Sequence, residues 1–367
     1  MKKLIIHPGF HKTGTTALQQ ALSEVRQELL ESNFYYPHIA GNAHHRAAWS
    51  IIEKTWGWKN RGGRSTGATE WKKLERKLKK NKGTAIISSE FFSEADENQL
   101  ANLAKQLEGV EVQIVFTWRP LPFMLASSYQ QYLKYGLKKS YLEWLDSIFQ
   151  APGEAKFTPS FWKRNLHGDV VSKWAEVFGA ENISLIAVNE ADPNFLYGSF
   201  SDLAGVPNGI IREPLHQEMN RSLTFNESSL LLEINRTYPK DLDWDSYEIF
   251  IRKGNIKALT GSAIYESSDE KILTPDWAIA KAAELNSKSV ARIKSLGVKI
   301  VGDIDRSDFS RIPIGTNAPV STISIATAAR AIIGVNMDSI KRMHGRAITR
   351  EFFHRLKKII KARLRLN

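Results

Sequence analysis

The sequence predicts an α/β fold in three layers, with a central parallel sheet, helical insertions and a basic C-terminal helix. Short continuous apolar runs alternate with helical patterns through the first half of the chain, which is typical of a parallel sheet covered on both faces. A glycine-containing turn joins the first apolar run to the first helical pattern. Several apolar runs end in charged residues, and the carboxyl ends of parallel strands are where such sheets bind ligands.

Strands are predicted where apolar runs lie between turn residues. They are KKLIIHPG at residues 2–9, TAIISSE at 84–90, VEVQIVFTW at 110–118 and ISLIAV at 183–188. Helices are predicted for about 17 residues from Gly14, over 68–83, near 97–108, over 122–136 and from 167. Residues 33–67 read as irregular, and the chain after about residue 210 as mostly helical. The strand ends at His7, Glu90 and Arg119 should therefore meet on one edge of the sheet.

The charge of the chain is concentrated at its C-terminus. We expect a main domain over 1–310, a linker over 311–323 and a basic amphipathic tail over 324–367. Residues 338–367 hold ten Lys or Arg and two acidic residues, a net +8 of the chain's +12. With only about +4 left on the body, the charge argues against a nucleic-acid partner.

Composition excludes several kinds of chemistry. The chain has no cysteine, which removes disulfides, thiol nucleophiles and Cys-ligated metal sites. No apolar run approaches the roughly 18 residues of a membrane span, and the first residues lack the apolar stretch of a secretory signal. The expected location is the cytoplasm, with the C-terminal tail as a candidate contact with the inner membrane face.

The first turn, HPGFHKTGTT at residues 7–16, has the pattern of a phosphate-binding loop. A strand, a glycine turn and a helix start direct backbone N–H groups at an anion. Gly9 and Gly14 have the Walker spacing, but Thr15 stands where the Walker lysine would be, and Lys12 lies inside the loop. No acidic residue ends a strand at the Walker B position, so we expect no metal and chemistry other than ATP phosphoryl transfer.

The segment KTGTT resembles the 5′-phosphosulfate loop of sulfotransferases that use 3′-phosphoadenosine 5′-phosphosulfate (PAPS), whose pattern is close to K-[ST]-G-T-T. The segment RPLPFMLASSY resembles the 3′-phosphate motif of that family, with Arg119, Ser127 and Tyr129 at its positions. The resemblance covers residues 4–240, and segments of this range are similar to bacterial and glycan-directed members of the family. Phe123 stands where the family often has Asp. The RKG at 252–254 resembles a late 3′-phosphate loop but lacks its downstream Gly-Asp-Trp, and is not carried over.

The resemblance implies a P-loop-NTPase-like fold and an enzyme that moves a sulfuryl group from PAPS to a hydroxyl of a carbohydrate or glycolipid. Adenosine 3′,5′-bisphosphate (PAP) would be released. Lys12 would stabilise charge on the departing phosphate. A strand-end guanidinium and a hydroxyl two helical turns later could clamp a 3′-phosphate. The implied nucleotide-binding residues are Lys12, Thr13, Gly14, Thr15, Thr16, Arg119 and Ser127.

Glu90 is the first candidate for the general base that deprotonates the acceptor, because it would emerge beside the phosphate loop. Related glycan sulfotransferases resemble this in using a strand-end Glu. The alternative for Glu90 is a structural ion pair with Lys12. Histidine is the second choice, with His11 next to Lys12 and the pair His44 and His45 further on. The pair has no metal-ligand partners at useful spacing, so zinc is not expected.

Two surfaces could bind larger partners. The basic stretch 54–82 contains Trp56, Trp58 and Trp71, which predicts an acceptor-binding flap, with His44 and His45 as further acceptor contacts; the alternative is a solvated basic helix with its tryptophans in the core. In the tail, apolar residues lie at helical spacing among cations, as on a helix that binds an anionic membrane. They are Ile348, Phe352, Leu356, Ile359 and Ile360. A partner-docking helix or a nucleic-acid tail would look similar, and the apolar bulk favours the membrane.

Two other functions fit parts of the sequence. A nucleotide-dependent kinase or NTPase would need Mg²⁺ and ATP, which the missing Walker lysine and Walker B acid argue against. A non-catalytic membrane or nucleic-acid adaptor on a P-loop fold would depend on the tail and not on Lys12.

Overall fold

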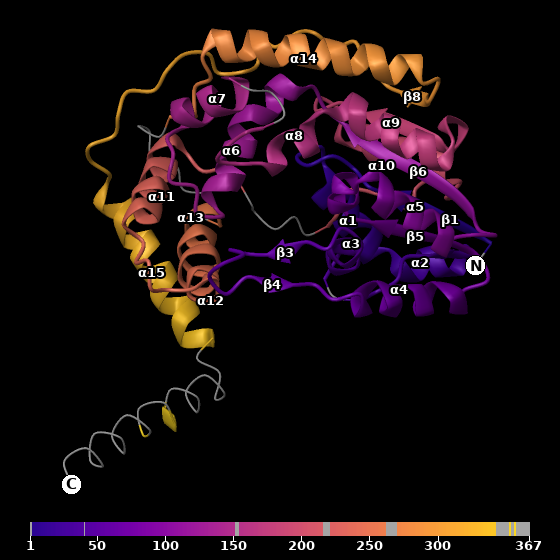
Figure 1. Cartoon of the computed structure of the whole chain (residues 1–367), viewed down its shortest axis with the longest axis horizontal. Helices are drawn as coiled ribbons and strands as arrows, with labels where there is room; N and C mark the ends of the chain where they lie inside the picture. Colours follow the sequence, from indigo (N-terminus) through magenta and orange to yellow (C-terminus); the bar gives the residue numbers. More distant parts are fainter. Residues whose placement is uncertain are drawn as a thin grey trace.

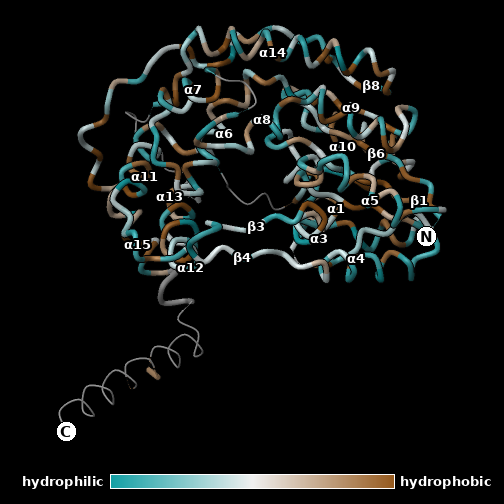
Figure 2. Tube along the Cα trace, viewed as in Figure 1, coloured by the Kyte–Doolittle hydropathy of each residue, from teal (hydrophilic) through white to brown (hydrophobic). Residues whose placement is uncertain are grey.

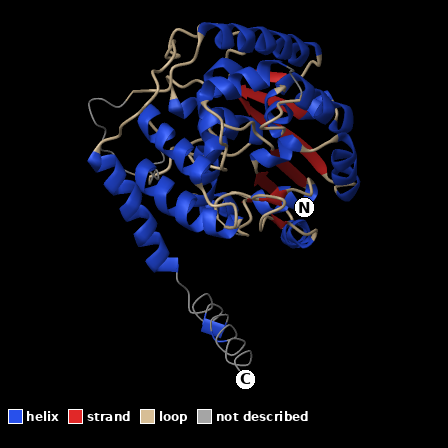
Figure 3. Cartoon of the chain, turned by 60° about the vertical axis from the view of Figure 1, so that its left-hand side comes forward, coloured by secondary structure: helices blue, strands red, loops and turns tan. Residues whose placement is uncertain are grey.

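A six-stranded sheet forms the centre of the structure, a computed structural model that describes residues 2–39, 41–150, 154–215, 221–261, 270–342, 352, 353 and 356 (Figures 1 and 3). The strand order is β2-β5-β1-β6-β7-β8, and all the pairs are parallel. The strands are β1 (Lys3–His7), β2 (Phe34–Tyr35), β5 (Thr84–Ser88), β6 (Glu111–Trp118), β7 (Ile183–Ala187) and β8 (Lys299–Val301). This confirms the predicted α/β class.

Helices cover both faces of the sheet. Along β1, Ile5 points to the core on one face of the sheet, whereas Leu4 and Ile6 point to the core on the opposite face. Each core is covered by its own group of helices. The first group is α1 (Thr15–Glu24), α2 (Arg26–Glu31) and α10 (Pro193–Ala204). The opposite group is α3 (His45–Ile51), α4 (Thr69–Lys80), α5 (Glu97–Gln106), α9 (His167–Phe178) and the second half of α14 (Asp276–Ser295). Alternate residues of the strands thus face opposite layers, as the unbroken apolar runs predict.

A second hydrophobic core lies beside the sheet and is built from helices (Figure 1). Its elements are η2 (Leu121–Met124), α6 (Leu125–Leu133), α7 (Tyr141–Gln150), α8 (Ser160–Asn165), α11 (Phe225–Thr237), α12 (Trp244–Tyr247), the π-helix η4 (Glu248–Ile256), α13 (Lys257–Thr260) and α15 (Ile325–Arg342). The antiparallel hairpin of β3 (Thr55–Trp56) and β4 (Arg64–Ser65) extends from the sheet side to this core. Two short 3-10 helices, η1 (Glu90–Glu94) and η3 (Ala180–Asn182), complete the fold.

The structure differs from the predicted elements at a few places. The predicted first helix is divided at Val25 into α1 and α2. The region 33–67 is not wholly irregular, since it holds α3 and three two-residue strands. Strand β8 was not predicted because only three residues form it and the residues around it read as helical.

The basic segment at 69–80 is an amphipathic helix packed on the sheet. Its apolar residues Trp71, Leu74 and Leu78 are buried, and Figure 2 shows the rest of α4 as mostly hydrophilic. The indole of Trp71 donates to the side-chain oxygen of Gln106 at 2.7 Å. For this helix the core interpretation of the tryptophan is therefore correct.

The structure describes only part of the predicted C-terminal tail. Of the predicted tail, the structure describes α15 and three later residues, so Ile348, Ile359 and Ile360 lie outside the described residues. The domain boundaries at 310 and 323 stay a prediction. Across the described part of the chain, no helix combines the length and the apolarity needed to cross a bilayer.

Candidate active site

The loop after β1 exposes the start of α1 to an anion. Lys12 and Gly14 both adopt left-handed backbone conformations, with φ of 66° and 83°. The helix begins at Thr15 with no side-chain cap and no acidic residue in its first turn. Within the described residues, the backbone N–H groups of Gly14, Thr15 and Thr16 donate no hydrogen bond. Unpaired amides at a positive helix end form a phosphate-sized anion site.

Contacts on the inner side of the loop fix this conformation. The hydroxyl of Thr13 donates to the Phe10 carbonyl at 2.7 Å and lies 2.7 Å from the hydroxyl of Thr117 on β6. Thr13 is buried, so its side chain holds the loop and does not line the cavity. This differs from the prediction that Thr13 contacts the nucleotide. A Cβ on Gly9 would lie 2.6 Å from the Thr15 methyl, which is why this position requires glycine.

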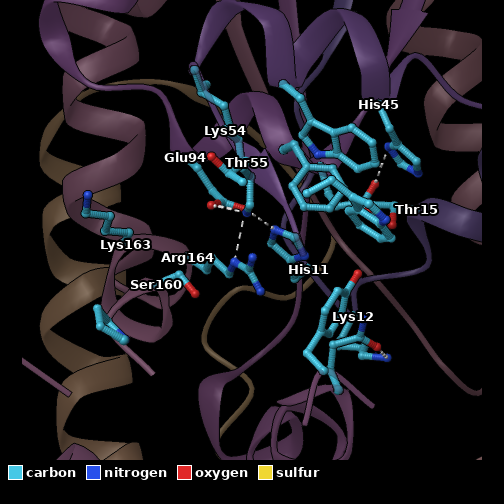
Figure 4. Close-up of a pocket in the computed structure, with 18 of the residues that line it drawn as sticks. His11, Lys12, Thr15, His45, Lys54, Thr55, Glu94, Ser160, Lys163 and Arg164 are labelled. Carbon is cyan, nitrogen blue, oxygen red and sulfur yellow. Dashed lines mark hydrogen bonds and ion pairs between the residues drawn. The ribbon is translucent and has the colours of Figure 1, made fainter. Parts of the chain in front are cut away.

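A cavity of about 810 Å³ opens beside the loop (Figure 4). One wall comes from the sheet side, through the loop, η1 and α3; the other comes from the hairpin, α6 and α8. The lining includes His11, Lys12, Gly14, Thr15, Thr16, His45, Trp49, Lys54, Trp56, Glu90, Glu94, Gln131, Tyr132, Tyr135, Lys163 and Arg164. Six of the predicted nucleotide-loop and acceptor positions, together with the candidate bases Glu90 and His11, thus meet in one space with aromatic walls.

The Lys12 ammonium reaches into this cavity. Its Nζ donates to Gln131 Oε1 at 3.2 Å and does not form an ion pair with Glu90, although both residues line the same space. Enclosure in the cavity lowers the pKa of Lys12, and the positive charge of Arg164 lowers it further, while the nearby carboxylate of Glu90 raises it. Among the described residues, Lys12 has no carboxylate partner, so its amino group is available to an anionic ligand.

Glu90 follows β5 and opens η1. Because His7 pairs with Ser88 in the parallel register, the residue after β5 emerges next to the loop after β1. Its Oε2 accepts from Gln19 Nε2 at 3.1 Å and lies 3.7 Å from His45 Nδ1. Burial raises the pKa of Glu90, but His45, His11 and the hydrogen bond from Gln19 outweigh it, so its pKa lies below the ordinary value. Glu90 is ionised at neutral pH and can accept a proton.

Glu94, one turn of η1 beyond Glu90, is the centre of a buried ionic cluster that the sequence analysis missed (Figure 4). Its side chain is 7% exposed and accepts from Lys54 Nζ at 2.7 and 2.8 Å, Arg164 Nε at 3.0 Å and His11 Nε2 at 3.2 Å. Burial raises the pKa of Glu94, but Arg164, the hydrogen bond from His11 and Lys54 hold it well below its usual range. The only sequence signal was a second acidic residue four positions after Glu90.

The same cluster sets the protonation of His11. Burial and the charge of Arg164 lower the pKa of His11 to about 4, although Glu94 acts in the opposite direction. His11 is therefore neutral at pH 7 and donates through Nε2 to Glu94. Because its Nε2 is already bonded to Glu94, the geometry favours Glu90 over His11 for deprotonation.

Two of the predicted acceptor contacts lie away from the cavity. His44 is buried, where Nε2 donates to the Pro37 carbonyl at 2.8 Å and Nδ1 accepts from the Ser88 amide at 3.0 Å. The Trp58 indole donates to the Tyr135 carbonyl at 2.9 Å and packs on the second core. The structure thus brings His45 and Trp56 to the cavity, but not His44 or Trp58.

Arg119 lies at a second cationic position, on the same edge of the sheet. It follows β6, and its guanidinium pairs with Glu190, which follows β7. Arg306, which follows β8, lies 3.4 Å from the same carboxylate. Both guanidinium groups lie over the ring of Phe123, at 5.3 and 4.6 Å from its centroid. A cavity of about 320 Å³ adjoins them, lined by Phe195, Arg306 and Arg311 among others.

Neither Arg306 nor Arg311 was predicted, because the short strand before them went unrecognised. Ser127 is half-buried on α6, and its hydroxyl donates to the Met124 carbonyl at 3.1 Å. It does not line the main cavity, and neither does Arg119. Of the predicted 3′-phosphate residues, Arg119 therefore lies at a neighbouring strand end and Ser127 on α6, and neither belongs to the loop cavity.

The RKG segment at 252–254 lies in η4 and not in a loop. The Arg252 guanidinium lies over the rings of Trp56, Tyr135 and Trp244, at 4.9, 4.4 and 5.4 Å. Arg252 thus joins the hairpin to the second core. This position agrees with the prediction that the RKG segment is not part of the nucleotide site. Within the described ranges, no group of three or more His, Asp or Glu side chains is arranged to hold a metal ion.

The sheet, the loop and the cavity define an α/β protein with a P-loop-like anion site at the start of α1. No protein-family model matches the chain, and no curated protein matches it. A solved structure, the sulfotransferase from Alicyclobacillus acidocaldarius, is similar at 15% sequence identity and a TM-score of 0.42, over 64% of this chain and 92% of that one. A likeness this distant says nothing about the function of this chain.

Proposed function

We propose that this chain is a PAPS-dependent sulfotransferase that moves the sulfuryl group to a hydroxyl of a carbohydrate or glycolipid acceptor and releases PAP. The observation that carries the proposal is the pair of cationic positions on one edge of the sheet. One is the loop with Lys12, and the other holds Arg119 and Arg306. A nucleotide phosphorylated at both the 5′ and the 3′ position needs two such anion sites, whereas ATP needs one.

The loop would hold the 5′-phosphosulfate. The free amides of Gly14, Thr15 and Thr16 would bind phosphate oxygens, and Lys12 would neutralise charge as the leaving group departs. In the reaction, the acceptor oxygen forms a bond to sulfur while the bond between sulfur and the 5′-phosphate oxygen breaks. The hydroxyl proton goes to the base, and PAP keeps the electron pair of the broken bond.

Aromatic residues from both walls of the cavity suit a sugar acceptor. The rings of Trp49 and Trp56 stack at 4.7 Å, and Tyr135 meets Trp56 edge to face at 5.4 Å. These three aromatic residues line the cavity that also contains Glu90, so a sugar packed on them would place a hydroxyl beside an ionised carboxylate. The cytoplasmic location stays a prediction from the cysteine-free sequence.

Calorimetric titration of the protein with PAP and with ATP, each with and without Mg²⁺, tests the proposal. We expect PAP to bind without metal and more than about tenfold more tightly than ATP, because a second phosphate site adds a charge-assisted contact. Arg306→Ala should weaken PAP binding and leave ATP binding unchanged. A preference for Mg–ATP would instead assign the chain to the kinases or NTPases, and binding of neither would favour the adaptor.

Replacing Glu90 with glutamine separates the two candidate bases. We expect turnover to fall by about 10²–10⁴-fold, because an amide cannot accept the acceptor proton. PAP affinity should stay within a few-fold, since Glu90 does not contact the loop amides. His11→Asn is the matched control, and its turnover should fall by less. The opposite order, with the His11 variant the more impaired, would reassign the base to histidine. Both variants are assayed as PAP release with an acceptor found by screening.

A further inference from the structure

The outer face of α15 carries an apolar stripe. Four of its side chains are exposed, Ile325 at 89%, Ile332 at 61%, Ile333 at 55% and Met337 at 51%. Their spacing of seven, one and four residues places them on one side of a helix. Isolated exposed apolar residues are ordinary, but four large ones on one side of a single helix indicate an interaction surface.

The opposite face of α15 is fixed against the second core, so the helix cannot rotate to bury the stripe. Thr327 and Ala331 are buried there. A Cβ on Gly334 would lie 2.4 Å from the Cβ of Ala258, which shows how closely the backbone of α15 approaches α13. Figures 1 and 3 show α15 at the periphery of the molecule.

The sequence that follows the stripe is strongly basic. Residues 338–367 hold ten Lys or Arg against two acidic residues. Three apolar side chains further along are also exposed, Phe352, Phe353 and Leu356. A surface that is apolar along one helix and cationic directly after it fits an anionic bilayer, which offers hydrocarbon and negative headgroups together. A second copy of this chain would bring like charge against like charge.

We propose that α15 docks the protein on an anionic lipid bilayer, with the Ile325–Met337 stripe in the interface and the charge of the basic C-terminal sequence as the source of the preference for negative headgroups. This docking is independent of the proposed reaction, because none of the described residues of α15 lines the cavity. It moves the predicted membrane contact from residues 348–360 to α15, the part of the predicted tail that packs against the second core.

Co-sedimentation with vesicles tests the docking. The full-length protein is mixed with vesicles of phosphatidylcholine alone or with about one quarter phosphatidylserine, at about 0.15 M salt. We expect binding to the anionic vesicles only, weakened by added salt. The double variant Ile332→Ser and Ile333→Ser should bind the anionic vesicles at least about tenfold more weakly than the wild type, because it removes two apolar side chains from the interface. Leu142→Ser, which changes an exposed leucine on α7, is the matched control and should bind like the wild type.

Several results would overturn the docking. They are equal binding of the double variant and the wild type, equal binding to neutral and anionic vesicles, or no vesicle binding at all. A dimer seen by light scattering that the double variant abolishes would show that a second copy covers the stripe instead. Circular dichroism melts verify that each variant is folded. No step uses PAPS or PAP, so failure of the proposed reaction leaves this test unaffected.

Discussion

Replacing Lys12 with alanine is expected to lower sulfuryl transfer by about 10²–10³-fold, the scale seen when one preorganised charge contact to a transition state is lost. Lys12 reaches into the cavity beside the free amides of the helix start, with Gln131 as its described partner. The charge that develops on the departing 5′-phosphate would lose its cation. PAP affinity should fall as well, by about tenfold, because the same ammonium binds the product phosphate.

Lys163→Ala is the matched control, since Lys163 is an exposed lysine of the same cavity on α8 (Figure 4). Its turnover should stay within a few-fold of the wild type. Both variants are compared by PAP release at saturating PAPS, with PAP titrations alongside. If Lys12→Ala kept full turnover, the loop would not bind the leaving group, and the assignment of the site would be wrong.

Replacing Glu94 with alanine is expected to destabilise the protein by about 3–5 kcal/mol, the cost of removing one partner from a buried ion pair. The side chain accepts from His11, Lys54 and Arg164, which come from the phosphate loop, the segment before β3 and α8. Without the carboxylate, two cations remain in a confined space with no counter-charge from Glu94. Urea unfolding measures the loss, and Glu108→Ala, at an exposed glutamate, should change stability by less than about 0.5 kcal/mol.

The effect of Glu94 should depend on pH. Because the pKa of Glu94 is lowered in the folded protein, its stabilising contribution is fully present above the unfolded pKa of about 4.3 and is lost as pH falls toward the lowered value. The stability difference between wild type and Glu94→Ala should therefore be largest at neutral pH and shrink below about pH 4. A difference that stayed constant from pH 7 to about pH 3 would show that packing, and not charge, accounts for the loss.

The parts of the site that depend on local pattern could be predicted from the sequence. The β1 strand, the glycine turn and the helix start follow one another along the chain, and Glu90 follows from the rule that parallel strands end on one edge. The Glu94 cluster could not be predicted, because its partners lie 40 to 83 residues away. His44 and His45 are adjacent, and only the start of α3 decides which of them faces the cavity.

The second cationic position could be predicted from the sequence only in part. Arg119 was predicted from a long apolar strand, but Arg306 depends on β8, which has three residues and gives no clear periodic signal. The edge strand is recognised only by its pairing with β7. A residue whose place is set by tertiary pairing alone leaves no trace in the sequence pattern.

The cavity takes its two walls from different hydrophobic cores. The loop after β1 rests on the sheet core, whereas Trp56 and Tyr135 pack on the helical core. Substitutions that reshape the helical wall can therefore accumulate without straining the loop, because distant sites change stability nearly additively. With such a division, the helical wall can change its shape while the loop keeps its own, so two proteins with the same loop and different helical walls need not bind the same molecule.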